Sequence, residues 1–319
     1  MSDGRFAPSP TGPLHLGNLR TALLAWLFAR SAGSRFLVRI EDLDPATSRP
    51  EHEASQLRDL EALGLDWDGP VVRQSERRAL HDTAIERLVE AGLTYPCFCT
   101  RREIRDAAAA PNGVGAFAAY PGTCRRLGRS EVTAREAAGR PSALRLRGDG
   151  ARVRFEDRVH GPVEGTVGDV VLRRNDGTPA YNLAVVVDDA AQGVEEVVRG
   201  DDLLGSTPSH VHLVALLGLA APRHTHVPLV LAPDGSRLAK RHGAVTLADR
   251  AALGQSPVDV LADLAASLGL ADAGEAVRPE RLLDRFDPEA LPRHPWVLTA
   301  AEVARPAAAG GRVSGSPSR

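Results

Sequence analysis

The sequence predicts an α/β protein built on a doubly wound parallel sheet of the Rossmann type. Three observations carry this prediction: an apolar strand opens the chain, an amphipathic helix follows it across a Pro/Gly loop, and a second apolar strand ends in an acidic cluster. Strand, helix and strand of these lengths form the repeating unit of parallel sheets. Hydrophobic residues make up 43% of the 319-residue chain and aromatic residues only 4%, so we expect a core of Leu, Val and Ala.

The expected elements follow one another from the N-terminus. The first strand covers 5–9, and the first helix covers 17–31 with Leu19, Leu23 and Leu27 on one face. We expect further strands at 36–40, 143–147, 152–155, 183–187, 196–199 and 227–231, and further helices at 51–63, 77–91, 210–217 and 258–268.

Two segments depart from this pattern. The residues from about 95 to 141 contain three cysteines, an alanine-rich stretch and a glycine-containing loop, which indicates an insertion. The segment 305–319 is rich in Pro, Gly, Ala and Ser, so we expect it to be disordered.

Charge and composition exclude several classes of protein. The formal net charge of −2 excludes a globally basic nucleic-acid binder, although a local basic face is still compatible with it. The chain has no apolar run long enough to span a membrane, and its first residues lack the pattern of a signal peptide. We therefore expect a cytoplasmic protein that does not associate with membranes.

The loop between the first strand and the first helix is the first candidate site. It would place backbone N–H groups and a helix N-terminus at the carboxyl end of a parallel strand, where anionic ligands bind in open sheets. Within it, His15 can donate a hydrogen bond to a phosphate oxygen, and Gly17 lets a ligand approach the backbone closely. Taken alone, His15 is at least as consistent with an ordinary loop histidine.

A second candidate is Lys240, the single lysine among 39 basic residues. A lysine retained in an arginine-rich chain suggests a place where a guanidinium cannot replace a compact ammonium. In the loop 236–243, it could close over a triphosphate and stabilise the charge on leaving pyrophosphate. The alternative is that its position is due to chance.

The three cysteines are the third candidate site. Cys97, Cys99 and Cys124 are an odd number in a chain expected to be cytoplasmic, which argues against a disulfide framework. They are either small buried residues or ligands of a shared metal, and no histidine lies between 94 and 125 to be a fourth ligand.

Separated segments resemble, in the same order, the class I glutamyl-tRNA synthetase family: RFAPSPTGPLHLGN, RIEDLD, YNLAVVVDD with EVVRGDDLL, and SRLAKRHG. The first resembles the HIGH element of that family and the last its KMSKS element. The resemblance covers residues 5–245 and implies the class I aminoacyl-tRNA synthetase catalytic core, a ligase that uses ATP with Mg²⁺. Two positions depart from the family pattern: Asn18 ends the HIGH element, and the lysine loop is degenerate as LAKRH.

The resemblance also implies roles for individual residues. His15 and Lys240 would be catalytic, and His15, Gly17, Asn18 and Lys240 would contact ATP. From the residues alone, Glu41 is equally consistent with a solvated acid and Tyr181 with a core aromatic. By resemblance, Glu41 would hold the α-ammonium of glutamate and Arg5 its side-chain carboxylate, in a pocket of Arg5, Phe6, Ala7, Pro8, Ser9, Glu41, Tyr181 and Arg199.

For the insertion, the resemblance implies one zinc ion per chain, held by Cys97, Cys99, Tyr120 and Cys124. The gap between Cys99 and Tyr120 is longer than in the family, because of the Ala/Gly-rich stretch 107–119. Three reduced, buried cysteines are the alternative. Basic residues of the insertion fit either a nucleic-acid contact or a solvated face: Arg101, Arg102, Arg105, Arg125, Arg126 and Arg129.

Full glutamyl-tRNA synthetases continue into a helical anticodon-binding domain, for which residues 241–319 are too few. The chain therefore resembles the short paralogue family, the glutamyl-Q tRNA(Asp) synthetases. This implies tRNA-independent activation of L-glutamate with ATP and transfer of glutamate to queuosine in the anticodon of tRNA(Asp). We expect a core at 1–245 with the insertion at about 95–141, a C-terminal helical junction region at 246–304, and a disordered tail at 305–319.

Under this interpretation, the partners are L-glutamate, ATP and the anticodon stem-loop of tRNA(Asp), and we expect a monomer. One alternative is a truncated glutamyl-tRNA synthetase that charges a tRNA 3′ end. A second is a catalytically silent paralogue, against which His15, Glu41 and Lys240 argue. A third is a nucleotidyltransferase of the same fold with another acid as substrate, against which Arg5, Tyr181 and Arg199 argue.

Overall fold

The structure, a computed structural model, describes residues 2–100, 102–104, 120–238, 242–243 and 245–304. Its centre is a seven-stranded sheet with the strand order β3-β2-β1-β9-β10-β6-β7, in which only β7 is antiparallel to its neighbour. The strands of this sheet are β1 (Gly4–Phe6), β2 (Phe36–Ile40), β3 (Val72–Arg73), β6 (Arg152–Asp157), β7 (Gly161–Thr166), β9 (Glu196–Gly200) and β10 (Arg223–Val227).

The winding of the sheet reverses at β1. The chain passes from β1 to β2 and β3 on one side, and later returns to place β9 and β10 on the other side. Such a reversal leaves a crevice at the carboxyl ends of β1 and β9, which is where open α/β sheets bind ligands. The predicted doubly wound α/β fold is confirmed.

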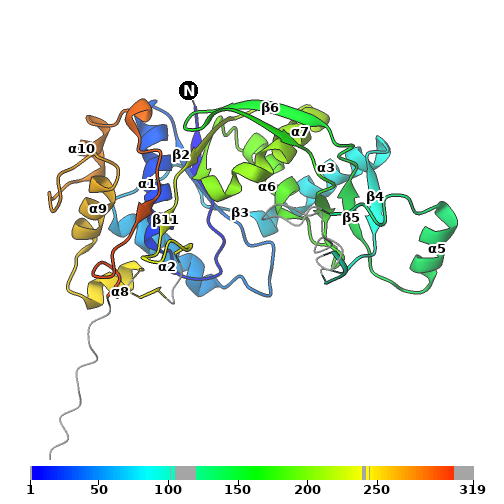
Figure 1. The fold of residues 1–319 in the computed structure, drawn as a ribbon, viewed down its shortest axis with the longest axis horizontal. Coiled ribbons are helices and arrows are strands. Elements are labelled where there is room, and N and C mark those ends of the chain that lie inside the picture. Colours follow the sequence, from blue (N-terminus) through cyan, green and yellow to red (C-terminus); the bar gives the residue numbers. More distant parts are fainter. Residues whose placement is uncertain (1, 101, 105–119, 239–241, 244, 305–319) are drawn as a thin grey trace, which may run out of the picture.

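Helices cover both faces of the sheet (Figure 1). On one face, α1 (Leu16–Ser31) packs against β1 and β9 and is in turn covered by α9 (Pro257–Ala266) and α10 (Pro279–Leu283), so that most of its residues are buried. On the other face, α3 (Arg78–Glu90), α6 (Tyr181–Ala191) and α7 (Thr207–Leu217) pack against one another.

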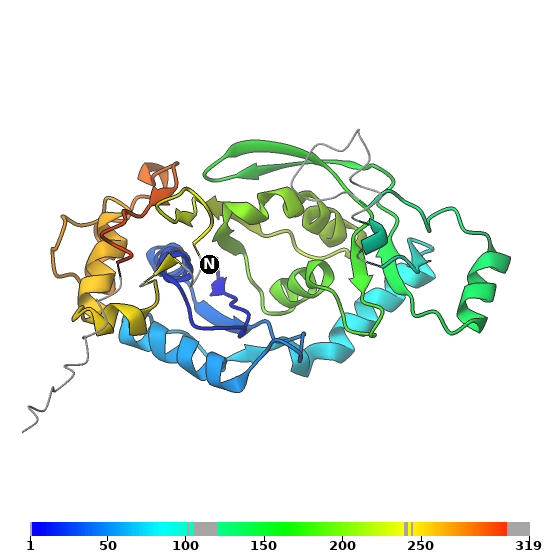
Figure 2. The same cartoon turned by 60° about the horizontal axis from the view of Figure 1, so that its bottom comes forward.

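A small antiparallel sheet lies at the end of the molecule opposite α10 (Figure 2). Its first strand, β4 (Thr94–Cys97), falls in the predicted insertion, but its partners β5 (Ala143–Leu146) and β8 (Val171–Arg173) come after residue 141. The remaining elements are α2 (Pro50–Ala62), η1 (Gln74–Arg77), α5 (Arg129–Ala137), η2 (Asp201–Ser206), β11 (Val230–Leu231), α8 (Leu247–Ala252), η4 (Pro288–Ala290) and β12 (Trp296–Val297).

Two predicted strands are wrong. Residues 183–187 belong to helix α6, where all of 183–189 are buried, so the sequence shows none of the polar periodicity of an amphipathic helix. The strand predicted at 227–231 is divided at Pro228, which has no N–H for a sheet ladder. The predicted tail at 305–319 lies outside the described residues. Within the described part of the chain, no helix combines the length and the apolar character needed to span a bilayer.

Candidate active site

A cleft of about 730 Å³ opens at the carboxyl ends of β1 and β9. Its walls are the loop after β1, the N-terminal turn of α1, the end of β9 and the start of η2. Lys240 lies outside the described residues. The cleft brings together every other predicted ATP and glutamate residue: Arg5, Phe6, Ala7, Pro8, Ser9, His15, Gly17, Asn18, Glu41, Tyr181 and Arg199.

His15 caps the N-terminus of α1. Its Nδ1 accepts the backbone N–H of Asn18 at 3.2 Å, and the Asn18 side chain accepts the backbone N–H of His15 at 3.1 Å. Burial and the nearby Arg237 lower the pKa of His15 to about 4, so the ring is neutral at pH 7. Since Nδ1 is an acceptor, the ring proton is on Nε2, which leaves one N–H donor for a ligand.

Gly17 has a packing role that the sequence did not indicate. A Cβ at this position would lie 3.0 Å from Cε1 and 3.1 Å from Nδ1 of the His15 ring. Any larger residue would therefore displace the ring that caps the helix. Glycine here keeps His15 in place as well as leaving room for a ligand.

The two faces of the sheet carry different side chains, because successive residues of a strand point to opposite faces. Phe6, Val38 and Val198 join the apolar core that contains α1, whereas Arg5 and Arg39 form ion pairs with Asp189 of α6 on the opposite face. Because side chains alternate along each strand, the face of the sheet that α6 covers carries these arginines. The mostly apolar sequence of the strands gives little sign of this charged face.

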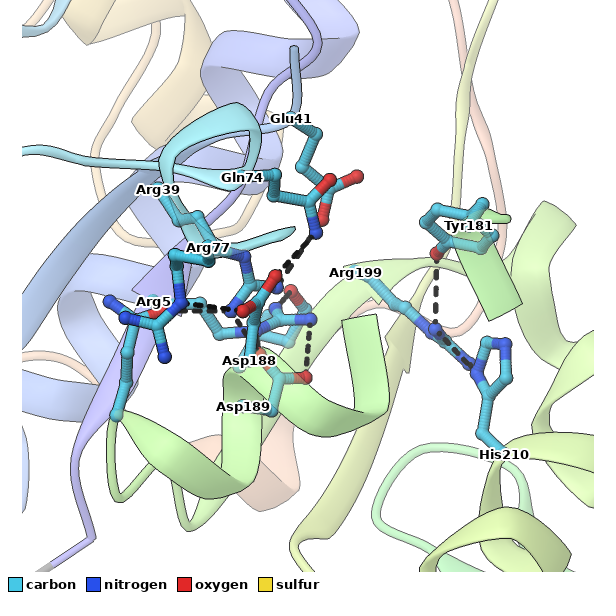
Figure 3. A network of polar contacts seen from close by, with 12 residues as sticks. Arg5, Arg39, Glu41, Gln74, Arg77, Tyr181, Asp188, Asp189, Arg199 and His210 are labelled. Atoms are coloured by element: carbon cyan, nitrogen blue, oxygen red, sulfur yellow. Dashed lines mark hydrogen bonds and ion pairs between the residues drawn. The ribbon is translucent and has the colours of Figure 1, made fainter. Parts of the chain in front are cut away.

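Arg5 lines the cleft, but its guanidinium is already hydrogen-bonded within the protein (Figure 3). Its Nε and Nη2 donate to the carboxylate of Asp189 at 2.9 and 3.3 Å, and its Nη1 donates to the carbonyl of Val198 at 3.2 Å. Arg39 binds the same carboxylate at 2.6 Å. Burial alone would raise the pKa of Asp189, but Arg39 and Arg5 hold it at about 2, so the acid stays ionised.

Glu41 follows β2 and lines the cleft. Its Oε1 accepts a hydrogen bond from Nη2 of Arg39 at 3.2 Å, and its side chain is only 9% exposed. Burial raises the pKa of Glu41, which means that the pocket favours a cation next to this carboxylate.

Arg199 is a buried cation at the base of the cleft. Its guanidinium donates to Tyr181, His210, His226 and Thr207 at 2.8 to 3.4 Å. None of these acceptors is a carboxylate, and burial lowers the pKa of Arg199. The arrangement can therefore receive an anionic group of a ligand.

A family model, described as "tRNA synthetases class I (E and Q), catalytic domain", matches residues 3–301. The chain belongs to this family. It is therefore an ATP-dependent ligase of the aminoacyl-tRNA synthetase type, and the cleft at the β1–β9 switch point is the candidate active site of a class I synthetase.

Known proteins resemble this synthetase over nearly its whole length. A glutamyl-Q tRNA(Asp) synthetase of Nocardia farcinica is 61% identical over 95% of both chains, and one of Symbiobacterium thermophilum is 50% identical over 95% of this chain and 98% of its own. The crystal structure of a glutamate tRNA ligase from Elizabethkingia meningosepticum, in complex with its amino acid, matches with a TM-score of 0.81 and 30% identity. That match covers 95% of this chain and 68% of the ligase.

The four predicted metal ligands of this synthetase converge. The Sγ atoms of Cys97, Cys99 and Cys124 all lie within 4.8 Å of one another, and those of Cys99 and Cys124 are 3.4 Å apart. The Tyr120 hydroxyl lies 3.4 Å from the sulfur of Cys97 and 3.8 Å from that of Cys99. Neighbouring sulfurs of a tetrahedral zinc site lie about 3.8 Å apart, so the cluster could bind such a metal.

The basic residues predicted for the insertion do not act alike. Arg125 forms ion pairs with Asp149 and Asp169, so much of its charge is used within the chain. Arg126 and Arg129 are exposed, as is Arg102. Arg101 and Arg105 lie outside the described residues.

Sequence reasoning missed the acids behind the cleft. Asp188 is fully buried and accepts hydrogen bonds from Gln74 and Arg77, with His81 Nε2 at 3.0 Å. Burial opposes its ionisation, but His81, Arg39 and Arg77 lower its pKa. Two adjacent acids after an apolar run were the only local signal of this network, since their partners lie more than a hundred residues away.

Proposed function

We propose that this synthetase activates L-glutamate with ATP in the absence of tRNA, and then transfers the glutamate to queuosine in the anticodon of tRNA(Asp). The observation that supports the first step is the position of the charged groups in the cleft. Cations and one acid line the sheet side, whereas a capped helix N-terminus with a free N–H donor lies beside them. The high identity to glutamyl-Q tRNA(Asp) synthetases supports the second step.

In the first step, Glu41 faces the α-ammonium of glutamate, while Arg5, Tyr181 and Arg199 face the side-chain carboxylate. An oxygen of the α-carboxylate attacks the α-phosphorus of ATP, the bond to pyrophosphate breaks, and glutamyl-adenylate forms. The attacking carboxylate is already ionised, so no general base is needed, and catalysis rests on positioning and on charge stabilisation.

On the phosphate side, His15 donates Nε2–H to a phosphate oxygen beside the backbone of Gly17 and Asn18. The ammonium of Lys240 stabilises the charge that develops on the pyrophosphate. Bound Mg²⁺ would neutralise part of the triphosphate charge.

In the second step, a hydroxyl of the queuosine cyclopentenediol attacks the activated carbonyl carbon. The bond to AMP breaks, the hydroxyl proton leaves, and an ester remains on the modified anticodon. The exposed residues Arg102, Arg126 and Arg129 would face the phosphates of the anticodon stem-loop. We also propose that the protein acts as a monomer in the cytoplasm.

The test is transfer of labelled glutamate, with ATP and magnesium, to bulk tRNA from queuosine-containing and queuosine-deficient cells. Label only on the queuosine-containing pool is the expected result. Equal label on both pools would make the protein a compact enzyme that charges a tRNA 3′ end, and absence of label on both would favour a silent paralogue. Pyrophosphate exchange without tRNA tests the first step by itself.

We further propose that Cys97, Cys99, Tyr120 and Cys124 hold one zinc ion, which would fix the small sheet and its neighbouring loops. Metal analysis of protein purified without chelator should find about one zinc per chain, and Cys124→Ser should lose it. A matched control is the exposed Ser130→Ala, which should keep its zinc. A metal-free wild-type protein would instead leave the cysteines as reduced, buried residues.

A further inference from the structure

Arg5 and Arg199, the two arginines that the sheet strands β1 and β9 present to the cleft, are held in opposite ways. The guanidinium of Arg5 is paired with the carboxylate of Asp189, so its charge is largely compensated within the protein. Among the described residues, Arg199 has no carboxylate within ion-pair distance. Its close partners are the ring nitrogens of His210 and His226 and two hydroxyl groups.

The ring of His226 can present only a lone pair to Arg199. Its Nδ1 lies 2.6 Å from the carboxylate of Asp157, which can only accept, so the proton is on Nδ1. Its Nε2 then accepts from Nε of Arg199 at 3.0 Å. Asp157 is itself buried and also receives the backbone N–H groups of Val159, His160 and His226.

His210 is likewise held as an acceptor for Arg199 (Figure 3). Its Nδ1 lies 3.1 Å from both Nη1 and Nη2 of Arg199, and a guanidinium has no acceptor, so Nδ1 must carry the lone pair. The proton is then on Nε2, which points to Oδ1 of Asn182 at 2.9 Å. Burial and Arg199 keep the pKa of His210 well below its usual value, in agreement with a neutral ring.

Neutral acceptors have a different effect from a carboxylate. They satisfy the donors of a buried guanidinium and fix its direction, but they leave its positive charge for whatever enters the cleft. The carboxylate nearest to Arg199 through these bonds, Asp157, lies one imidazole ring further away and is bound by three backbone N–H groups. A ligand carboxylate can therefore complete the ion pair that the protein leaves open.

We propose that His210 and His226, held in single neutral tautomers by Asn182 and Asp157, are positioning residues that aim Arg199 into the cleft without neutralising it. They thereby set the preference of the site for an amino acid with an anionic side chain over its neutral amide. This inference rests on the proposed function, because it assumes that glutamate is the amino acid activated.

Two variants of nearly equal size at position 210 separate the effect of side-chain charge from that of side-chain shape. His210→Asn keeps a neutral acceptor where Nδ1 was, and His210→Asp places a carboxylate of the same size there. We expect the KM for glutamate in pyrophosphate exchange to rise about tenfold to a hundredfold in His210→Asp relative to His210→Asn, with the KM for ATP and the kcat nearly equal. The ratio of kcat/KM for glutamate over glutamine should fall with it.

A second variant covers the case in which His210→Asp does not fold. Asn182 is only half-buried, so Asn182→Ala should fold, and it should raise the KM for glutamate severalfold by releasing the His210 ring. Asn182→Ala added to His210→Asn should not raise the KM for glutamate further. The asparagine at position 210 is shorter than histidine, so its side chain should not reach Asn182. A merely structural role would give additive losses and would move the KM for ATP as well.

The outcomes separate this inference from the proposed function. If the wild-type protein exchanges pyrophosphate with glutamate, but His210→Asn and His210→Asp show the same KM for glutamate, the positioning role is wrong and the proposed function stands. If the wild-type protein neither binds nor activates glutamate, both are wrong. A selective rise in His210→Asp supports both.

Discussion

At the scale of single residues, His15 serves the cleft through two different nitrogens. Nδ1 closes the first turn of α1, while Nε2 is the donor left for a ligand. A side chain that keeps the first function and loses the second would separate stability from activity. Asparagine is such a side chain, because its oxygen is among the best helix N-caps.

We therefore predict that His15→Asn unfolds at nearly the wild-type urea concentration but exchanges pyrophosphate about a hundredfold more slowly. His15→Ala should lose the same activity and also about 1 kcal/mol of stability, because the cap is gone. Urea unfolding and pyrophosphate exchange of the two variants measure both effects. Wild-type exchange in His15→Asn would show that Nε2 does not contact the phosphates.

The single lysine permits a sharp test of the lysine-loop hypothesis. Lys240→Arg keeps the charge but replaces a compact ammonium by a planar guanidinium, so we predict loss of most adenylate formation while glutamate still binds. Pyrophosphate exchange and calorimetric titration with glutamate measure the two quantities. An unchanged exchange rate would remove the reason for singling out this lysine.

Residue-scale prediction from the sequence succeeded where a residue lies in a local motif. His15, Gly17 and Asn18 lie within four residues of sequence at the start of α1, and the structure brings them into the cleft with Arg5 and Glu41. Their binding and catalytic roles remain predictions. What the sequence could not show is the layer behind them, since Arg5 and Asp189 are 184 residues apart and no local pattern joins them.

At the scale of elements, burial explains both the successes and the errors. Strand β2 was predicted with its exact limits because an apolar run between turn signals is unambiguous at that length. Helix α6 was mistaken for a strand because its β-branched run, 185–187, is buried on every side. In such a case the polar half of the helical pattern is absent, and the sequence alone does not distinguish the two states.

Helix α1 is tied to later elements by one buried arginine. Nη1 of Arg20 donates to the carbonyl of Pro228 at 2.8 Å, and Nε and Nη2 donate to Ser267 at 3.0 and 3.3 Å. Removing the guanidinium leaves buried acceptors without partners, so we predict that Arg20→Met loses about 2 to 4 kcal/mol of unfolding free energy. The exposed Arg35→Met, which loses only a surface ion pair with Asp3, is the control and should change urea unfolding little. Equal losses in both variants would refute this role for Arg20.

At the scale of the whole molecule, buried histidines make the fold sensitive to acid. Burial lowers the pKa of His224 to about 3 and that of His15 to about 4, against 6.5 for a free histidine. As the pH falls below 6.5, these histidines bind protons in the unfolded chain but stay neutral in the folded chain. The free energy of unfolding therefore falls. Below about pH 4 the loss continues, because Asp189, with a folded pKa of about 2, also favours the folded state only while it is ionised.

We predict that the melting temperature is nearly constant from pH 8 to 7 and then falls steadily between pH 6.5 and 4. His224→Gln removes one of the titrating groups and should flatten this slope, although it lowers stability at pH 7 by loss of ring packing against Phe155 and His226. Thermal unfolding followed by circular dichroism across this range measures the slope. A melting temperature that is constant down to pH 4.5 would contradict the linkage.

The position of α1 has a consequence for synthesis on the ribosome. Its apolar residues share one core with Leu261, Leu264, Leu282 and Leu298, which lie in the last quarter of the chain. Because translation delivers the N-terminus first, α1 emerges long before the residues that cover it. The nascent chain must therefore carry an incompletely covered, strongly apolar helix until residues 261–298 have left the exit tunnel, which is the interval in which a chaperone would be needed most.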